Sequence, residues 1–358
     1  MDIYMAVVWL LILFMLIGIA DKITGNRFGY GEAFEEGFRA MGPLGLVMIG
    51  MISAAPVLAD WIQPAVVPLF QFIGADPAVF FGMLLAIDMG GYSLALELAE
   101  TPEAGLFAGV ILATMIGPVF VFTIPVALGL INPSDYSILG KGMIIGLIPV
   151  PAGAFAAGAL MGMPWQAIFV QLIPVLFLTA VLVIGMSAVQ PLMIRLFIIA
   201  GRGIIVLTTV LIGIVGVQEL SGAVIVEGMT PFAESMEIIG VIALVLAGAF
   251  PFVHFIKRSA LPHLQRLCGK KPLDDEGLAG FISQFAHSIP MYKRLDQMGE
   301  RAKLINIAFS VSGAFVLGAH LGFTAAVEPN LVIPMIAGKL TSGVLAVCLA
   351  DQYYRWSH

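Results

Sequence analysis

Charged residues are scarce in this sequence. Asp, Glu, Lys and Arg make up 11% of its 358 residues, whereas hydrophobic residues make up 60%. Soluble domains carry about 25% charged residues, so this chain has too little charge to cover a water-facing surface. The shortage excludes soluble enzymes, nucleic-acid-binding proteins and disordered proteins. The net charge of −6 also leaves no basic surface for a nucleic acid.

Cysteines and catalytic motifs are also rare or missing. The two cysteines, Cys268 and Cys348, lie far apart in the chain, and we expect the basic stretch around Cys268 in the cytoplasm, where disulfides are rare. The sequence has no His-Glu-x-x-His, Walker or Gly-x-Ser-x-Gly motif. A second deep acid that could pair with Asp88 in an aspartyl protease site is not evident. We therefore expect neither an enzyme nor a cofactor or metal site.

Long apolar runs dominate the rest of the chain. One helical crossing needs about 20 apolar residues, and the alternation of apolar and polar residues that is typical of β-barrel strands is missing. The sequence therefore predicts an all-α polytopic membrane protein with about nine transmembrane helices, some of them broken. We place the helices at residues 3–20, 40–59, 104–134, 203–218, 238–256, 304–327 and 331–350, with two more inside 142–194 on either side of a turn at 162–165.

Two further apolar stretches are interrupted. Residues 78–96 are broken at Asp88–Gly91, and residues 277–292 are broken at His287–Pro290. Each stretch is either a full crossing or a re-entrant hairpin that returns to its own side of the membrane. Basic residues mark the cytoplasmic side. They cluster at Lys22, Arg27 and Arg39, at Arg195 and Arg202, at Lys257, Arg258, Arg266, Lys270 and Lys271, and at Lys293, Arg294, Arg301 and Lys303.

One topology places all of these basic clusters inside. It has the N-terminus outside, nine crossings, two re-entrant hairpins and a cytoplasmic C-terminus. Counting both interrupted stretches as crossings would instead put one of the two largest clusters outside. We therefore favour the hairpins, near residues 78–96 and 277–292.

An internal repeat supports this topology. Pro56 pairs with Pro251, and Pro77 pairs with Pro272, at one common offset along the chain. With a few inserted residues, the break at Asp88 corresponds to the break at His287. Inverted repeats with hairpins and broken helices are a common plan of secondary transporters, which hold their substrate near the membrane midplane.

Loop charge reverses between the two halves, as expected if they cross the membrane in opposite senses. The loops at 60–76 and 97–103 are acidic, whereas their counterparts at 257–272 and 293–303 are basic. We therefore divide the chain into a first inverted repeat at 1–160, a linking transmembrane helix at 161–195 and a second inverted repeat at 196–358.

Asp88 is the most informative single residue. A carboxylate at membrane depth costs ~2.5–3.5 kcal/mol, so a cation, a proton or a buried partner has to offset that cost. The adjacent residues Met89, Gly90 and Gly91 allow the backbone to open, which is tolerated where it lines a cavity. We expect these four residues to bind substrate. The alternative is a hairpin tip that reaches water, with Asp88 only capping a half-helix.

Other polar and aromatic residues at membrane depth are candidates for the same site. Each also has an ordinary structural explanation, such as a hydrogen bond to a carbonyl, helix–helix bonding or core packing. At the outer mouth, Glu97 and Glu100 either attract cations or form a solvated edge. The remaining substrate-binding candidates are Thr123, His287, Ser288, Asn306, His320 and Phe323.

Several motifs give the chain a family resemblance. It resembles the bacterial ethanolamine-utilisation transporters, the EutH family, from about residue 32 to residue 345. The resemblance is carried by the segments 40–46 (AMGPLGL), 55–59 (APVLA), 87–91 (IDMGG), 97–99 (ELA), 117–118 (GP), 124–129 (IPVALG), 132–135 (NPSD), 289–291 (IPM) and 320–323 (HLGF).

The resemblance implies a protein of the bacterial inner membrane that passes ethanolamine into the cytoplasm for catabolism. Ethanolamine is a primary amine that is largely protonated at neutral pH, and a lone deep carboxylate suits its ammonium group. Two alternatives remain open, namely an ion-coupled carrier for another small amine or organic solute, and a channel-like membrane subunit. The run of small residues at 152–162 could pack closely against a second protomer, so we expect a homo-oligomer, most simply a dimer.

The reversed orientation of the halves can be tested by cysteine accessibility. A cysteine introduced at Glu100 should react with an impermeant probe from outside the cell, and one introduced at Lys271 should react only from inside. Labelling of both positions from the same face would contradict the topology.

Overall fold

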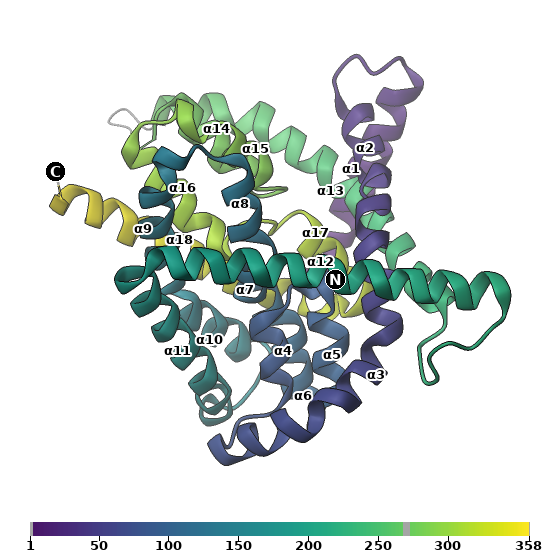
Figure 1. Ribbon diagram of the computed structural model, residues 1–358. Coiled ribbons are helices and arrows are strands. Elements are labelled where there is room, and N and C mark those ends of the chain that lie inside the picture. Colours follow the sequence, from purple (N-terminus) through teal and green to yellow (C-terminus); the bar gives the residue numbers. More distant parts are fainter. Residues whose placement is uncertain (1–2, 268–272, 358) are drawn as a thin grey trace. The chain divides into compact units, whose positions relative to one another are not determined.

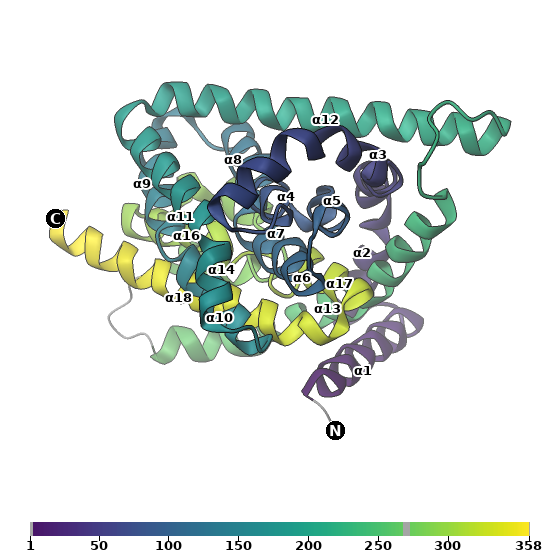
Figure 2. The same ribbon diagram turned by 90° about the horizontal axis from the view of Figure 1, so that it is seen from below.

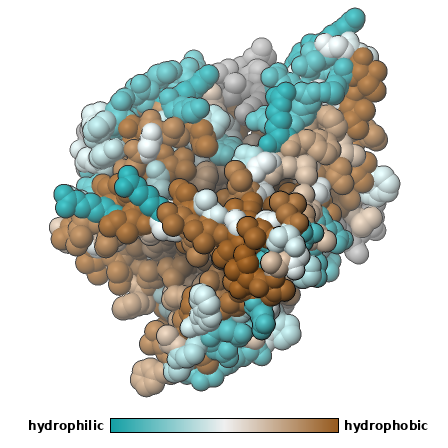
Figure 3. Space-filling model, turned by 45° about the vertical axis from the view of Figure 1, so that its right-hand side comes forward, coloured by the Kyte–Doolittle hydropathy of each residue, from teal (hydrophilic) through white to brown (hydrophobic). Residues whose placement is uncertain are grey.

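The computed structural model describes residues 3–267 and 273–357 (Figure 1). The regular elements of these residues are helices, and no strand occurs among them. Eight helices in the described part are long and apolar enough to cross a membrane. Figure 3 shows hydrophobic side chains over much of one face, where a soluble protein would carry charge. The all-α polytopic class is thus confirmed.

Contacts group the chain into two compact units, each made of separate segments. Unit 1 is formed by Met1–Met41, Val126–Pro149 and Gly240–His358, and unit 2 by Gly42–Pro125 and Val150–Ile239. Unit 1 contains α1 (Ile3–Ile23), α2 (Tyr30–Arg39), most of α8 (Ile124–Leu130), η4 (Pro133–Asp135), α9 (Tyr136–Leu147), most of α13 (Phe232–Leu267), α14 (Asp275–Ser283), α15 (Ile289–Lys293), η5 (Leu295–Gln297), α16 (Glu300–Ser312), α17 (Ala319–Val327), η6 (Pro329–Leu331) and α18 (Val332–Ser357).

Unit 2 contains the remaining elements. They are α3 (Met41–Ile73), α4 (Ala78–Leu84), η1 (Ile87–Met89), α5 (Gly91–Leu98), α6 (Pro102–Leu106), η2 (Phe107–Leu112), α7 (Ala113–Met115), η3 (Val119–Thr123), α10 (Val150–Leu160), α11 (Trp165–Ala188) and α12 (Gln190–Ser221). Figure 2 shows α12 as one long uninterrupted helix.

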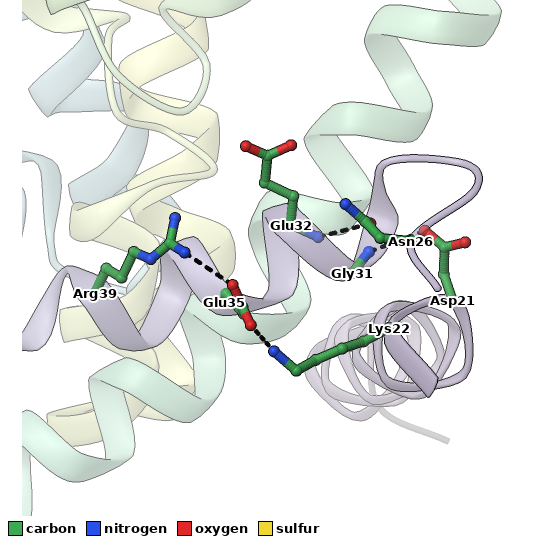
Figure 4. Close-up of polar contacts among 7 residues, drawn as sticks. All are labelled: Asp21, Lys22, Asn26, Gly31, Glu32, Glu35 and Arg39. Carbon is green, nitrogen blue, oxygen red and sulfur yellow. Dashed lines mark hydrogen bonds and ion pairs between the residues drawn. The ribbon is translucent and has the colours of Figure 1, made fainter. Parts of the chain in front are cut away.

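A polar network joins α1 to α2 within unit 1 (Figure 4). The buried carboxylate of Asp21 accepts hydrogen bonds from the backbone N–H groups of Phe28, Tyr30 and Gly31, at 3.0, 2.8 and 3.1 Å. These N–H groups lie at or just before the first turn of α2, where a helix has no internal acceptors for them. Asp21 therefore fixes the turn between the two helices.

Charged side chains extend this network along α2. Glu35 forms ion pairs with Lys22 on α1 and with Arg39 one turn further along α2. Because these groups are partly or largely exposed, each pair adds little stability. The network mainly sets the geometry of a loop that the sequence assigns to the cytoplasm.

The predicted helices agree with the structure at most positions. The turn inside 142–194 is confirmed, because α10 ends at Leu160, Gly162 adopts a positive φ of 81° and α11 begins at Trp165. The acidic segment 60–76 was expected as a loop, but it is helical as far as Ile73. Helix α3 runs through Pro56, Pro64 and Pro68 without ending. Similarly, α13 continues to Leu267. The positions Cys268, Gly269, Lys270, Lys271 and Pro272 lie outside the described residues.

One predicted transmembrane helix is broken in two. The apolar run 304–327 was expected as a crossing, but α16 ends at Ser312 and α17 begins only at Ala319. The segment between them contains Phe315, which has a positive φ of 63°. Such a conformation is rare for a side chain of this size. The run 102–130, by contrast, stays helical but contains two π-helical segments, η2 and η3.

The two units contain the same series of elements. In unit 2, the long helix α3 is followed by the hairpin α4–η1–α5 and by the irregular helix that runs from α6 to η3. In unit 1, the long helix α13 is followed by the hairpin α14–α15 and by the broken helix α16–α17. Figure 1 shows α4 and α5 side by side. The stretches 78–96 and 277–292 are thus pairs of short helices joined at a break, as the sequence indicates.

One aspartate closes the base of the hairpin in unit 2. The carboxylate of Asp76 accepts hydrogen bonds from the backbone N–H groups of Ala78 at 2.9 Å, Glu100 at 3.0 Å and Thr101 at 3.2 Å. It therefore ties the start of the hairpin to the residues that follow its end. Burial raises the pKa of Asp76. The three N–H groups lower this pKa and the nearby charge of Glu100 raises it, but each of these effects is smaller.

An equivalent aspartate closes the hairpin in unit 1. The carboxylate of Asp274 accepts hydrogen bonds from the N–H groups of Gly277 at 2.7 Å and Gly299 at 2.6 Å. Gly277 lies in the first turn of α14, and Gly299 directly precedes α16. We call Asp76 and Asp274 the hairpin clamps. The two clamps have equivalent positions in the two units, although the internal repeat found in the sequence did not pair them.

Removal of either clamp should destabilise the protein. Hydrogen bonds to a charged group contribute about 1.5–3 kcal/mol each, so we expect Asp76→Ala and Asp274→Ala each to lower the free energy of unfolding by about 3 kcal/mol. Thermal unfolding of the purified protein in mild detergent measures this change. Glu227→Ala is the matched control, since Glu227 is an exposed acid in the loop between α12 and α13. Equal unfolding temperatures for the clamp and control variants would refute the clamp.

Candidate functional site

The hairpin of unit 2 places Asp88 at its tip. Helix α4 ends at Leu84, and Leu85 and Ala86 are extended before the short helix η1, which contains Asp88. Gly90 then adopts a positive φ of 95° and begins the return through α5. Backbone N–H groups of Met89 and Gly91 donate to the carbonyl of Ala86, each at 2.9 Å. The predicted opening of the backbone at this point is thus present.

The surroundings of Asp88 offer it little compensation for its charge. The side chain is half-buried, and no lysine, arginine or histidine among the described residues forms an ion pair with it. Asp88 lies just before the N-terminus of α5, where the helix dipole favours negative charge. The carboxylate therefore remains able to bind a cationic ligand.

The irregular helix of unit 2 packs directly against this break. A Cβ atom added to Gly117 would lie 2.0 Å from the carbonyl oxygen of Leu85, so only glycine fits there. Thr123 follows in the π-helical segment η3. Its side chain is buried, and its hydroxyl has no hydrogen-bond partner among the described residues. π-helical segments frequently occur at functional sites.

The acids of the expected outer mouth, Glu97 and Glu100, are both exposed. Glu100 accepts a hydrogen bond from Gln71 at 2.6 Å, and Glu97 lies close enough to Asp60 for their charges to repel. They lie at the end of α5 and just beyond it, towards the base of the hairpin and away from the tip. Their role in attracting cations stays a prediction.

The hairpin of unit 1 has a different tip. Residues 284–288 join α14 to α15, and they contact the broken segment between α16 and α17. The N–H group of Phe315 donates to the carbonyl of Gln284 at 2.7 Å, and that of Leu317 donates to the carbonyl of Phe285 at 2.8 Å. A Cβ atom on Gly318 would lie 2.0 Å from the carbonyl oxygen of Ala286. The close glycine contact of unit 2 therefore recurs here.

His287 has a structural contact at this tip. Its Nδ1 atom accepts a hydrogen bond from the N–H group of Ile289 at 3.2 Å, so it satisfies one N–H group at the start of α15. Its ring lies 5.0 Å from that of Phe315. His287 also lines a cavity of about 350 Å³ together with Glu36 and His254. The His287 side chain thus both caps the start of α15 and lines a cavity.

Asn306 holds the hairpin against α16. Its oxygen accepts a hydrogen bond from Gln284 at 2.9 Å, and its amide nitrogen donates to the carbonyls of Gly277 at 3.0 Å and Ala302 at 2.9 Å. The amide therefore already has partners within unit 1. Helix–helix bonding, the alternative interpretation for Asn306, accounts for these contacts, and a substrate contact stays a prediction.

Ser288 and His320 have unused hydrogen-bonding capacity. Both side chains are buried, and Ser288 Oγ and His320 Nδ1 have no hydrogen-bond partner among the described residues. The rings of Phe315 and His320 are 5.2 Å apart. Phe323 lies on α17 and is also buried, as its expected position in the site requires.

A buried lysine in α18 escaped the sequence analysis. Lys339 is only 1% exposed, and it lies close to His320. The run 331–350 was interpreted as an ordinary transmembrane helix, although a single lysine in its middle is a recognised sign of function. Gln284 and Thr324 were also missed. Each carries a buried oxygen without a partner among the described residues, a property that only the folded structure shows.

The structure thus brings the predicted residues together in two groups. Asp88, Met89, Gly90, Gly91 and Thr123 belong to unit 2, whereas His287, Ser288, Asn306, His320 and Phe323 belong to unit 1. The expectation that both groups complete one cavity stays a prediction.

Comparison with known proteins identifies the family. A family described as "Ethanolamine utilisation protein, EutH" matches residues 3–352. The chain belongs to the EutH family. This confirms the resemblance seen in the sequence motifs. No solved structure matches the chain.

Named relatives cover nearly the whole length of the chain. A "Probable ethanolamine permease EutH" of Listeria monocytogenes is 46% identical over 349 residues, which is 98% of this chain and 94% of that protein. The protein of the same name in Salmonella typhimurium is 37% identical, covering 96% of this chain and 94% of that protein. "Uncharacterized protein YxeR" of Bacillus subtilis is 45% identical, with coverage of 96% and 93%.

The two glycine contacts predict matched effects of substitution. Gly117→Ala and Gly318→Ala should each destabilise the protein by at least about 1–3 kcal/mol, because the added methyl group would overlap a backbone carbonyl. Gly129→Ala and Gly203→Ala are suitable controls, since nothing lies within 4 Å of a Cβ atom there. Thermal unfolding and monodispersity in detergent measure the difference. Wild-type stability of Gly117→Ala would show that the hairpin of unit 2 does not pack as described.

Proposed function

We propose that this protein is a permease that carries ethanolamine, as its ammonium ion, across the bacterial inner membrane. Membership of the EutH family and the names of its relatives support this proposal. The same names favour a transporter over an enzyme. The eight apolar helices support a multi-pass location in the bilayer.

The observation that carries the proposal is the state of Asp88. Its carboxylate is half-buried at a glycine-containing break in an apolar hairpin, and no internal cation among the described residues pairs with it. A charge that is partly withdrawn from water is stabilised by a partner of opposite charge. A small ammonium ion supplies that partner during transport and leaves again, which is what a carrier requires.

The arrangement of the chain also supports inverted repeats. The two matching series of elements, the two hairpin clamps and the two glycine contacts are the features expected if both halves derive from one plan. With the basic clusters in the cytoplasm, this plan places the N-terminus outside and the C-terminus inside. A dimer remains part of the proposal. Gly153, Ala154, Ala157 and Gly158 of α10 are buried within the protomer, so the contact would use its exposed small residues, Ala152 and Ala159.

Two substitutions at Asp88 test its role. Asp88→Asn keeps the shape but removes the charge that faces the ammonium group. Removing one member of such a buried pair costs about 3–5 kcal/mol, so ethanolamine binding should weaken at least about a hundredfold. Asp88→Glu should retain part of the transport, because the carboxylate survives with a displacement of about one methylene group.

The measurement is the initial rate of radiolabelled ethanolamine uptake against concentration, in proteoliposomes with equal amounts of protein. Counterflow and saturation distinguish a carrier from a channel. Glu227→Gln, in the exposed loop between α12 and α13, is the control for a general loss of negative charge. A near-native Michaelis constant for Asp88→Asn would show that Asp88 only caps the hairpin.

A further inference from the structure

Four buried polar atoms in unit 1 lack hydrogen-bond partners among the described residues. They are Gln284 Oε1, Ser288 Oγ, His320 Nδ1 and Thr324 Oγ1. The exposed fraction of these side chains is 4% for His320 and 0% for the other three. Buried polar groups without partners are rare in folded proteins, and each needs an explanation. One such explanation is a ligand that binds between these atoms.

These side chains lie on segments that contact one another. Gln284 and Ser288 begin and end the hairpin tip, and the tip is hydrogen-bonded to the broken segment through Phe315 and Leu317. The ring of Phe315 contacts both His287, next to Ser288, and His320. Thr324 follows His320 by one turn of α17.

The orientation of Gln284 fixes the chemistry of one position. Its amide nitrogen donates to Asn306 at 2.9 Å, so its Oε1 atom is left as an acceptor. The hydroxyl groups of Ser288 and Thr324 can donate or accept. The cluster therefore suits a group that both donates and accepts hydrogen bonds.

The residue types of these segments disfavour other ligands. Residues 284–292 and 304–327 contain no aspartate or glutamate, so they offer no carboxylate to an ammonium group. An anion would meet the fixed acceptor of Gln284. A neutral hydroxyl group meets neither difficulty.

We propose that this cluster binds the hydroxyl group of the transported amino alcohol. Gln284 Oε1 accepts its hydrogen, and the Ser288 or Thr324 hydroxyl donates to its oxygen. The inference rests on the proposed function and adds to it, since it explains why an alcohol and not merely an amine is selected. A site built for a hydroxyl group discriminates strongly against an analogue that lacks it.

Ethylamine provides the first test, because it keeps the ammonium group and lacks the hydroxyl. Uptake of radiolabelled ethanolamine and ethylamine into proteoliposomes gives their ratio of transport efficiencies. The wild type should favour ethanolamine at least about tenfold. In the double variant Ser288→Ala/Thr324→Val, the ratio should fall towards one, through a loss for ethanolamine with little change for ethylamine.

The control variant is Thr179→Val. Thr179 lies on α11 of unit 2 and likewise has a buried hydroxyl group without a partner among the described residues, so it should leave the ratio unchanged. If the double variant is not monodisperse, Thr324→Val alone should lower the ratio in the same direction. Equal losses for both amines, or an unchanged ratio, would overturn the inference.

Ethylenediamine tests the charge argument, because a second amino group takes the place of the hydroxyl. At mildly acidic pH it should compete poorly with ethanolamine in the wild type. Competition as effective as that of unlabelled ethanolamine would contradict the argument. If the wild type transports ethanolamine and ethylamine with equal efficiency, only the hydroxyl site is refuted. If it transports neither ethanolamine nor ethylamine, the proposed function and the inference are refuted together.

Discussion

The interior of a bilayer offers no water to a backbone that leaves the helical conformation, so every exposed N–H and C=O group there needs a partner inside the protein. The two hairpin tips are the places where this requirement is hardest to meet. In unit 2, the carbonyl of Ala86 accepts two N–H groups of the tip itself. In unit 1, the tip instead uses the backbone of the broken segment around Phe315. Glycine at 117 and 318 permits the required close approach.

Much of this plan can be predicted from the sequence because it follows from local features. Apolar runs locate the long helices, Gly162 marks the turn before α11, and the polar breaks at Asp88 and His287 locate the two tips. The glycines around His320 indicate an interruption of 304–327, but its position could not be predicted, because the turns at 313–318 depend on acceptors at Gln284 and Phe285, which lie far away in the chain. The helical extension of α3 past Asp60 was missed because charge and proline favour a loop.

The candidate site was predictable to a smaller extent. Asp88 stands out because its charge lies in an apolar hairpin, and His320 because glycines flank it. Whether a polar side chain has unused capacity depends on tertiary contacts. Asn306 has its amide satisfied by its neighbours, whereas Gln284, of similar chemistry, keeps one acceptor without a partner in the described part of the chain. Lys339 could have been found, since a buried lysine within a membrane helix requires an explanation.

The hairpin clamps have a mechanical consequence. Asp76 connects residues 24 and 25 positions further along the chain, and Asp274 connects a residue 25 positions further along. Each hairpin is therefore a closed arm whose two legs cannot separate at the base without breaking charge-assisted hydrogen bonds. A force applied at a tip is therefore carried to the base as a displacement of the whole arm, and does not separate its legs. Stiffness of this kind makes each hairpin respond as a single element.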